Sequence, residues 1–309
     1  MTTRFRRPLT SVLLAVSLLA TIGVGRAAGE TLVAAGDIAN PPGGGRGDVA
    51  TARVVEANRP TLVLALGDTQ YERGGYRNFL AAYDRSWGRF KARTRPAVGN
   101  HEYMDPAGPA AGYFRYFGRR AGDPGRGYYS FDVGGWHAVA LNSACGQAGA
   151  PSCGHGSPHW SWLKRDLAAH RPRCTVAFFH HPYRSSAAPY TGKKELSHLW
   201  ALLVAGGVDV VLNGHNHAYE RLKPMRTMGS VDYHGAPWTI VAGTGGRSLI
   251  PYTSVHRNSA YRTVRYGVYK MVLFPDRWVG AHKGTDGVTR DLHSIGCHRA
   301  RPAARRERW

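Results

Sequence analysis

Five apolar runs in this chain are each followed at once by a short polar motif, and this pattern constrains the fold more than any other feature. Continuous apolar runs are typical of strands that are covered on both faces in a mainly parallel sheet. The runs are 31–35, 61–66, 95–98, 174–179 and 208–212. The motifs after them are Gly36-Asp37, Gly67-Asp68-Thr69-Gln70-Tyr71, Gly99-Asn100-His101-Glu102, His180-His181-Pro182 and Gly214-His215-Asn216-His217. Because ligands of open α/β sheets gather at the carboxyl ends of strands, we expect these motifs to converge.

The side chains in the motifs are those of a mixed oxygen and nitrogen metal site. Asp, Asn and Tyr supply oxygen ligands and His supplies nitrogen ligands, a set that suits transition metals. In an extended chain, residues i and i+2 point the same way, so His215 and His217 can both face the site. A single Gly-Asp is more often only a turn, and a single His is more often a packing or surface residue. Their joint occurrence at strand ends indicates a centre for two metal ions.

The order of the motifs resembles that of the calcineurin-like metallophosphoesterases, and specifically of their purple acid phosphatase branch. Tyr71, three residues after the second aspartate, is typical of that branch. The resemblance continues through Trp160-Ser161-Trp162-Leu163 and Gly243-Thr244-Gly245-Gly246 and covers nearly all of residues 31–293. It implies a four-layer α/β/β/α sandwich with a dinuclear metal site at the strand ends. Strand–helix alternation in the first half and strand pairs in the second half favour the same architecture.

Carried over to this chain, the resemblance assigns ligands to two metal ions. One ion would be held by Asp37, Asp68, Tyr71 and His217, and Asp68 would bridge to a second ion held by Asn100, His180 and His215. In the family the tyrosinate site holds Fe(III), and the other site holds Fe(II), Zn(II) or Mn(II). Two metal ions about 3.5–4 Å apart activate water as hydroxide and neutralise the phosphoryl oxygens during an in-line displacement.

His101 is the candidate catalytic residue. The resemblance implies that it binds the phosphate and protonates the leaving alkoxide, and Glu102 could orient it. The register His-x-Pro selects His180 as the ligand and leaves His181 facing the substrate or supporting the ligands.

Substrate contacts are less constrained by the sequence. Plant-type relatives carry further histidines in the loop after Pro182, where this chain has other residues at 183–190. The candidates for substrate contacts in this chain are Arg184, Tyr190 and His155, with His181 beside them.

The sequence thus predicts an exported dinuclear metallophosphatase that hydrolyses phosphomonoesters of small phosphorylated substrates. Two alternatives stay open at this stage. One is a phosphodiesterase that uses the same site, and the other is a catalytically silent protein of the same fold that binds phosphate or polyanions.

Residues 1–27 have the pattern of a secretory signal peptide. Arginines precede an apolar stretch at 9–24, and Gly25-Arg26-Ala27 offers small residues for cleavage after Ala27. A membrane anchor is the alternative, but the stretch is short for a span and contains Ser11, Ser17 and Thr21. Arg6-Arg7-Pro8-Leu9 faintly resembles a twin-arginine signal. We expect a secreted or extracytoplasmic protein without a stable membrane anchor, a catalytic domain over 31–297, and a basic, disordered tail at 298–309.

Cysteine number and charge add two further expectations. Four cysteines in an exported chain predict two disulfides, of three possible pairings. Cys145 and Cys153 flank a short Gly- and Ala-rich loop, which favours a local bridge and leaves Cys174 with Cys297. The chain has 41 Lys and Arg against 20 Asp and Glu, a formal net charge of +21. Such a field attracts anionic substrates and favours non-specific adhesion to polyanions or cell-wall polymers, although the charges could simply be solvated. No motif for sequence-specific nucleic acid binding is present.

Helical spacing and turn residues predict the remaining elements. Helices are expected over 48–58 with Asp48 as the cap, over 76–90, over 157–169 with Ser157 as the cap, and through 196–203. Gly134-Gly135 joins two β-rich segments, 128–133 and 136–141, which predicts a hairpin. A second strand pair is expected at 266–274 and 277–281.

Overall fold

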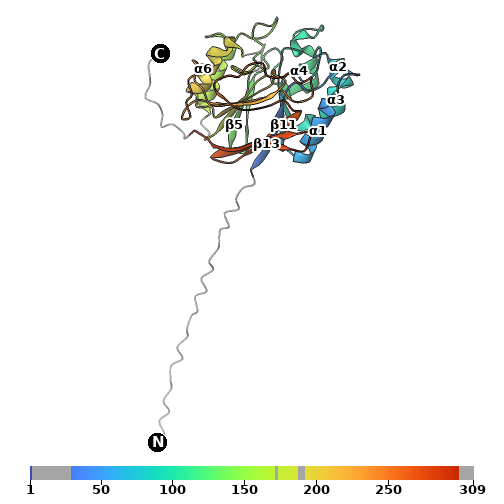
Figure 1. Cartoon of the computed structure of the whole chain (residues 1–309). Coiled ribbons are helices and arrows are strands. Elements are labelled where there is room, and N and C mark those ends of the chain that lie inside the picture. Colours follow the sequence, from blue (N-terminus) through green and yellow to red (C-terminus); the bar gives the residue numbers. More distant parts are fainter. Residues whose placement is uncertain (2–28, 171–172, 187–191, 299–309) are drawn as a thin grey trace.

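The computed structural model describes Met1 and residues 29–170, 173–186 and 192–298 (Figure 1). Most of the predicted signal peptide, most of the predicted tail and Tyr190 lie outside these residues. Within the described residues, no helix is both long enough and apolar enough to cross a membrane.

Two β-sheets form the centre of the molecule. The six-stranded sheet has the order β13-β12-β11-β1-β2-β3, and the seven-stranded sheet has the order β10-β8-β9-β7-β6-β5-β4. The strands of the first sheet are β1 (Glu30–Ala35), β2 (Leu62–Leu66), β3 (Thr94–Ala97), β11 (Gly267–Leu273), β12 (Arg277–Gly284) and β13 (Thr289–Gly296). Those of the second are β4 (Tyr129–Val133), β5 (Trp136–Ala140), β6 (Thr175–Phe178), β7 (Val210–Asn213), β8 (Tyr219–Leu222), β9 (Trp238–Ala242) and β10 (Ser259–Thr263).

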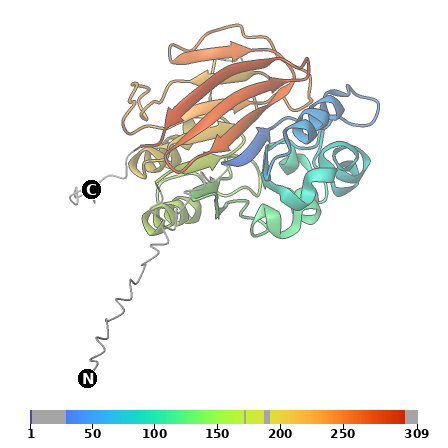
Figure 2. The ribbon, with the colours of Figure 1, turned by 90° about the horizontal axis from the view of Figure 1, so that it is seen from below.

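Helices cover the outer side of each sheet, so that α1 and α3 lie on one side of the strands and α6 on the other (Figures 1 and 2). The first sheet carries α1 (Gly47–Asn58), α2 (Tyr76–Ala81), α3 (Tyr83–Ser86) and α4 (Ala111–Phe117), with 3-10 turns η1 (Trp87–Arg93), η2 (Glu102–Met104) and η3 (Gly118–Ala121). The second carries α5 (Pro158–Ala169) and α6 (Ser197–Ala205), with η4 (Lys194–Leu196).

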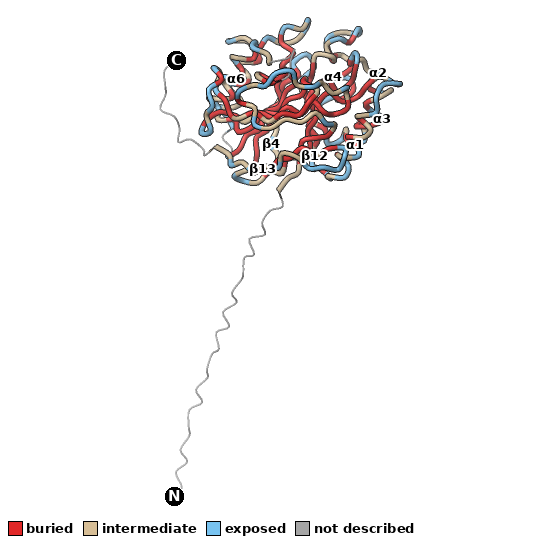
Figure 3. Tube along the Cα trace, viewed as in Figure 1, coloured by how far each residue is buried: buried red, intermediate tan, exposed pale blue. Residues whose placement is uncertain are grey.

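The buried side chains form three apolar layers, and Figure 3 shows buried segments running through the middle of the molecule. Leu32 of β1 lies between the sheets with Val176 of β6, whereas its neighbour Val33 lies under the helices with Phe79 of α2. Successive strand residues point to opposite faces, so a strand buried on both faces must be apolar throughout. This geometry explains the continuous apolar runs and confirms the α/β/β/α fold.

Most predicted elements are confirmed. The five apolar runs form β1, β2, β3, β6 and β7, and neighbouring strands among them are parallel. The hairpin is β4–β5, and Ser157 caps α5 by accepting a hydrogen bond from the Trp160 N–H. Asp48, predicted as a cap, instead lies in the first turn of α1.

The prediction of one helix over 76–90 is wrong. The segment is divided into α2, α3 and η1. At the break, the N–H of Tyr83 donates to the side-chain oxygen of Gln70 at 3.0 Å instead of continuing the helical ladder. Ala82 there has φ −131° and ψ −69°, outside the helical region. A side chain from the loop before α2 therefore competes with the local helix.

Both predicted disulfides are confirmed. Cys145 is bonded to Cys153, and Cys174 is bonded to Cys297 across 123 residues. The second bridge joins the beginning of β6 to the chain just after β13.

Candidate metal centre

The polar motifs after the five strands meet at one edge of the sheets, and a first group forms around Tyr71. The Tyr71 hydroxyl donates to Asp37 Oδ1 at 2.8 Å and lies 3.1 Å from Asp68 Oδ2. His217 Nε2 lies 3.1 Å from the same hydroxyl and 3.3 Å from Asp37 Oδ1. The structure thus brings together the four residues predicted to share the first metal ion.

A second group forms around His180. Its Nε2 lies 3.2 Å from Asn100 Oδ1, 3.2 Å from His215 Nδ1 and 3.1 Å from Asp68 Oδ2. Its Nδ1 lies 2.9 Å from the backbone carbonyl oxygen of Leu66. Asp68 Oδ2 contacts both groups, the position that a bridging ligand needs.

The backbone turns the two carboxylates toward these groups. Asp37, Asp68 and His215 have positive φ values of 59°, 46° and 69°, a conformation that is rare outside glycine and concentrates at functional sites. Asp37 accepts the His215 N–H at Oδ2, and Asp68 accepts the His101 N–H at Oδ1. Each carboxylate therefore uses one oxygen to hold a loop and presents the other to the centre.

Glu102 has a role that the sequence alone does not reveal. It is fully buried and accepts the N–H groups of Asp68 at 3.0 Å, Thr69 at 2.7 Å and Gly99 at 2.7 Å. The His101 ring is held elsewhere, with Nδ1 2.6 Å from the backbone carbonyl oxygen of Glu72. The hypothesis that Glu102 orients His101 is therefore wrong, because this carboxylate joins the two loops that carry Asp68 and Asn100. The only signal was indirect, since turns at strand ends leave amide donors that need an acceptor.

Burial and neighbouring charges shift the pKa values of the groups in the centre in different directions. Burial raises the pKa of Tyr71 well above its usual value, and the neighbouring Asp37 and Asp68 raise it further. Burial lowers the pKa of His215 to about 3, with the repulsion of His180 adding to this effect. For His180, burial opposes the charged form, but the attraction and hydrogen bond of Asp68, the attraction of Asp37 and the hydrogen bond with the Leu66 carbonyl oxygen together outweigh it and raise the pKa to about 9.

The donor set fits two metal ions. Ligand atoms of Asp37, Asp68 and His180 lie within 4.8 Å of one another, as do those of His180, His181 and His215. Carboxylate, phenol, amide and imidazole groups crowd together where little water reaches them, an arrangement that is costly without a cation.

The other predicted site residues lie at different distances from this centre. His101 stands at its solvent side, with a side chain 21% exposed and Nε2 3.8 Å from Asp68 Oδ2. His181 is buried beside the centre, with Nδ1 3.0 Å from Ser143 Oγ and its ring 4.4 Å from that of His215. Arg184 instead folds onto the Tyr183 ring at 4.3 Å, and His155 packs against Trp160 at 4.3 Å.

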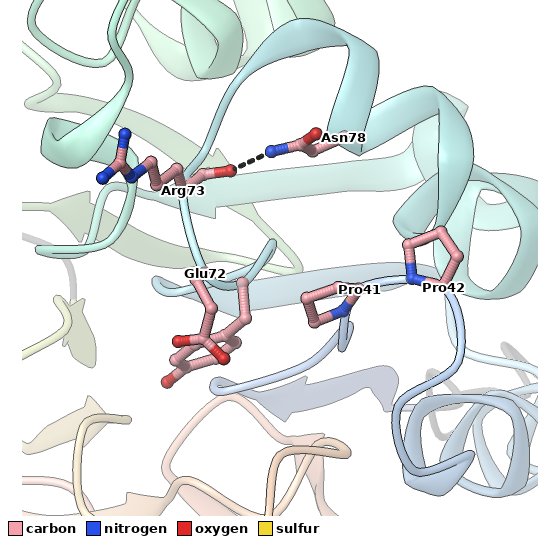
Figure 4. A pocket seen from close by; sticks show the side chains of 6 residues that line it. Pro41, Pro42, Glu72, Arg73 and Asn78 are labelled. Carbon is pink, nitrogen blue, oxygen red and sulfur yellow. Dashed lines mark hydrogen bonds between the residues drawn. The ribbon is translucent and has the colours of Figure 1, made fainter.

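A pocket opens next to Tyr71 (Figure 4). It is lined by Pro41, Pro42, Tyr71, Glu72, Arg73 and Asn78. The two prolines come from the loop after β1, and the other residues come from the loop after β2 and the beginning of α2. This pocket offers space for a solute beside the phenol of Tyr71.

Comparisons with known proteins agree with this geometry. The family model described as calcineurin-like phosphoesterase matches residues 31–219. Purple acid phosphatase 18 of Arabidopsis thaliana is 32% identical over 197 residues, which cover 57% of this chain and 43% of that protein. Purple acid phosphatase 15 of the same plant is 29% identical over 224 residues, which cover 61% of this chain and 40% of that protein. The chain thus spans less than half the length of these relatives.

Solved structures share the fold. Purple acid phosphatase PPD1 from yellow lupin seeds matches with a TM-score of 0.67 and 20% identity, over 86% of this chain and 53% of that chain. GAP50, described as the anchor in the inner membrane complex of Plasmodium, matches with a TM-score of 0.64 and 14% identity, over 87% of this chain and 89% of that chain. A fold that an enzyme shares with an anchor protein does not itself establish catalysis, which must be argued from the site.

Proposed function

The chain belongs to the calcineurin-like phosphoesterase family, and we propose that it is a dinuclear metal-dependent phosphatase that hydrolyses phosphomonoesters. The observation that carries this proposal is the convergence of Asp37, Asp68, Tyr71, Asn100, His180, His215 and His217 at one edge of the sheets. An anchor or a silent binding protein has no need for this set of ligands, three of them in strained backbone conformations.

The two groups of residues correspond to two metal positions. Asp37, Asp68, Tyr71 and His217 would hold one ion, for which Fe(III) is favoured because phenolate and carboxylate are hard ligands. Asn100, His180 and His215, with Asp68 shared, would hold Fe(II), Zn(II) or Mn(II). When bound, the metal ions would activate water for attack on phosphorus and neutralise the phosphoryl oxygens.

His101 is positioned to bind the phosphate and to protonate the leaving alkoxide. Its Nδ1–H donates to the Glu72 carbonyl oxygen, which fixes the orientation of the ring. Nε2 therefore faces the centre, and in the imidazolium form it carries the proton that an alkoxide requires. The partial exposure of His101 lets a substrate reach it.

The experiment that tests this function combines metal analysis with two substrates. The full protein should contain two metal ions per chain and hydrolyse 4-nitrophenyl phosphate faster than bis(4-nitrophenyl) phosphate. A faster diester reaction would make it a phosphodiesterase. Two metal ions without hydrolysis of either ester would contradict the proposal and favour a phosphate- or polyanion-binding protein.

The metal assignment has its own optical test. Tyrosinate bound to Fe(III) gives a visible charge-transfer colour, so the protein should be purple to pink and Tyr71→Phe should bleach it. A colourless, active protein that contains only zinc or manganese would refute Fe(III) and leave the two-metal centre in place.

We also propose that residues 1–27 direct export and are removed, which leaves the domain at 31–297 and the basic tail at 298–309. The pattern of arginines, apolar stretch and small residues supports this. Expression in a bacterium should yield an extracytoplasmic protein whose first residue is Ala28. An uncleaved N-terminus in the membrane fraction would favour an anchor instead.

A further inference from the structure

Arg247 stands at the rim of the metal centre and has no part in the ligand set. Its guanidinium carbon lies 4.6 Å from the centroid of the Tyr71 ring. Its Nη1 lies 2.6 Å from Glu72 Oε1 and 3.0 Å from Asn40 Oδ1. The side chain is 27% exposed, so a solute that enters the centre can reach it.

A glycine-rich loop after β9 fixes the position of this arginine. A Cβ atom on Gly245 would lie 2.5 Å from the Gly36 carbonyl oxygen, and one on Gly246 would lie 2.3 Å from that of Ile38. Only glycine permits so close an approach to the loop that carries the ligand Asp37.

Hydrogen bonds then join the two loops. The Gly245 N–H donates to the Gly36 carbonyl oxygen at 3.0 Å, and the Arg247 N–H donates to the Asp37 carbonyl oxygen at 2.8 Å. The side chain of Asn40 donates to the Gly246 carbonyl oxygen at 3.0 Å. The backbone of Arg247 is thus fixed relative to the metal centre, unlike that of an ordinary surface arginine.

Glu72 connects Arg247 with His101 and with the pocket. Its backbone carbonyl oxygen holds the His101 ring, and its carboxylate pairs with Arg247 at the pocket wall. In Figure 4 the guanidinium of Arg73 points away from both prolines. The Glu72 side chain is 53% exposed, and an ion pair this exposed contributes little to stability. An anion held at the centre can therefore replace Glu72 as the partner of Arg247.

We propose that Arg247 is a specificity-determining residue that binds a non-bridging oxygen of a phosphomonoester, and that Glu72 is its partner in the free enzyme. This inference rests on the proposed function and adds a reason for monoester preference. A monoester dianion carries one more negative charge than a diester and has three non-bridging oxygens, so a charge-assisted hydrogen bond from the guanidinium favours the monoester. A diester has one negative charge and only two non-bridging oxygens.

The test compares Arg247→Ala and Arg247→Lys with the wild type, all loaded with metal. For Arg247→Ala we expect kcat/KM for 4-nitrophenyl phosphate to fall about 10- to 100-fold, the usual worth of a hydrogen bond to a charged group. The loss on bis(4-nitrophenyl) phosphate should stay below about 3-fold, and Arg247→Lys should recover part of the monoester activity because it keeps the charge. Glu72→Gln should tighten the binding of inorganic phosphate, because it removes the competing carboxylate.

Arg277→Ala is the matched control. Arg277 also pairs with an acid, Asp276 at 3.0 Å, and also lies over an aromatic ring, Phe274 at 4.4 Å. It sits at the turn between β11 and β12, at the end of the first sheet opposite the metal centre. Because Arg277→Ala removes the same charge from the molecule, it distinguishes a direct contact between Arg247 and the phosphate from a general attraction of anions. We expect changes below about 2-fold on both esters.

Calorimetry with inorganic phosphate gives a readout that needs no turnover. Metal-loaded wild type should bind phosphate at least about 10-fold more tightly than Arg247→Ala. Equal losses on the two esters, unchanged phosphate affinity, or loss of metal from Arg247→Ala would each overturn the inference. If the wild type hydrolyses neither ester, the proposed function fails, and the calorimetric comparison alone still decides whether Arg247 binds phosphate.

Discussion

Two histidine–carboxylate clusters lie at opposite ends of the seven-stranded sheet, and they differ in how their charges are balanced. The candidate metal centre follows the carboxyl ends of β6 and β7. The second group, which we call the hairpin cluster, consists of His137, Asp132, Asp166, Ser130 and His170 at the other end of β5, β4 and α5. His137 pairs with Thr175, the first residue of β6, which places it at the end of the sheet opposite His180.

One added proton on His137 satisfies the hydrogen bonds between His137 and its two carboxylates in the hairpin cluster. His137 Nδ1 lies 2.9 Å from Asp132 Oδ1, and Nε2 lies 2.9 Å from Asp166 Oδ2, so each N–H of an imidazolium has its own acceptor. Burial opposes this charge, but the hydrogen bonds to Asp166 and Asp132 outweigh it and raise the pKa of His137. Although His137, Asp166 and His170 are close enough to share a metal ion, a proton already satisfies the buried ring.

One added proton cannot satisfy the atoms that surround His180 in the metal centre. Asp68, Asn100 and His215 all place an atom within 3.2 Å of the same nitrogen of His180, and that nitrogen carries at most one proton. Both clusters contain His and Asp, so residue types do not distinguish a metal centre from a structural cluster. The number of hydrogen-bond acceptors for each available proton distinguishes them.

The largest expected effect separates His180 from its neighbour His181. His180→Ala removes the ligand at the middle of the second group, so the protein should lose the divalent metal ion and nearly all activity. His181→Ala should keep both metal ions and lose activity about 10- to 100-fold at most, as residues that support ligands do. Metal content and turnover of the two variants decide this. Metal loss in His181→Ala with retention in His180→Ala would reverse the assignment.

A second prediction tests whether His101 acts on the substrate or only supports Asn100. General acid catalysis is worth about 10²- to 10⁴-fold when the leaving group is a poor one. His101→Ala should therefore lose activity on an alkyl phosphate by that factor and lose much less activity on an aryl phosphate. Its metal content should not change. Equal losses on both substrates would indicate phosphate binding instead, and metal loss would return His101 to a structural role.

Replacing His137 in the hairpin cluster should lower the stability of the fold and leave catalysis unchanged. His137→Leu leaves Asp166, only 7% exposed, without its imidazole partner, which should lower the free energy of unfolding by about 3 kcal/mol. Urea unfolding measures this loss, and metal content and kcat of the folded variant should match the wild type. His170→Ala is the control, because that half-exposed ring only stacks on His137 at 4.0 Å and forms a local contact with Asp166. Loss of a metal ion on His137→Leu would contradict the division between the clusters.

The smallest expected effect is the pH dependence of the stability that His137 contributes. The folded protein holds the pKa of His137 above the unfolded value of 6.5, so its contribution is complete below pH 6.5 and is lost as the pH rises through the folded pKa. The difference in unfolding free energy between wild type and His137→Leu should therefore shrink on the alkaline side. Taking a difference cancels the titration of the metal centre. A difference that is constant or grows with pH would show that His137 is buried without its extra proton.

The sequence predicts the parts of the molecule that depend on local patterns of residues. The strands followed from apolar runs, and the seven proposed ligand positions came from the family resemblance of the motifs directly after those strands. Glu102 and Arg247 could not be assigned in this way, because their partners come from distant loops, as with Arg247 and Asn40, 207 residues apart. The prediction of one helix over 76–90 failed because Gln70, in the loop just before it, accepts the Tyr83 N–H and interrupts the helical hydrogen bonds. β13 was missed because it is an edge strand whose residues are only partly buried.

The pairing of β1 with β11 sets an order of events during synthesis. Glu30 lies opposite Leu273, so the strand that precedes Asp37 stays an open edge until residue 273 has been made. All the proposed ligands, by contrast, lie before residue 218. A nascent chain therefore contains every ligand long before it can close the sheet that holds Asp37 and Asp68 in place.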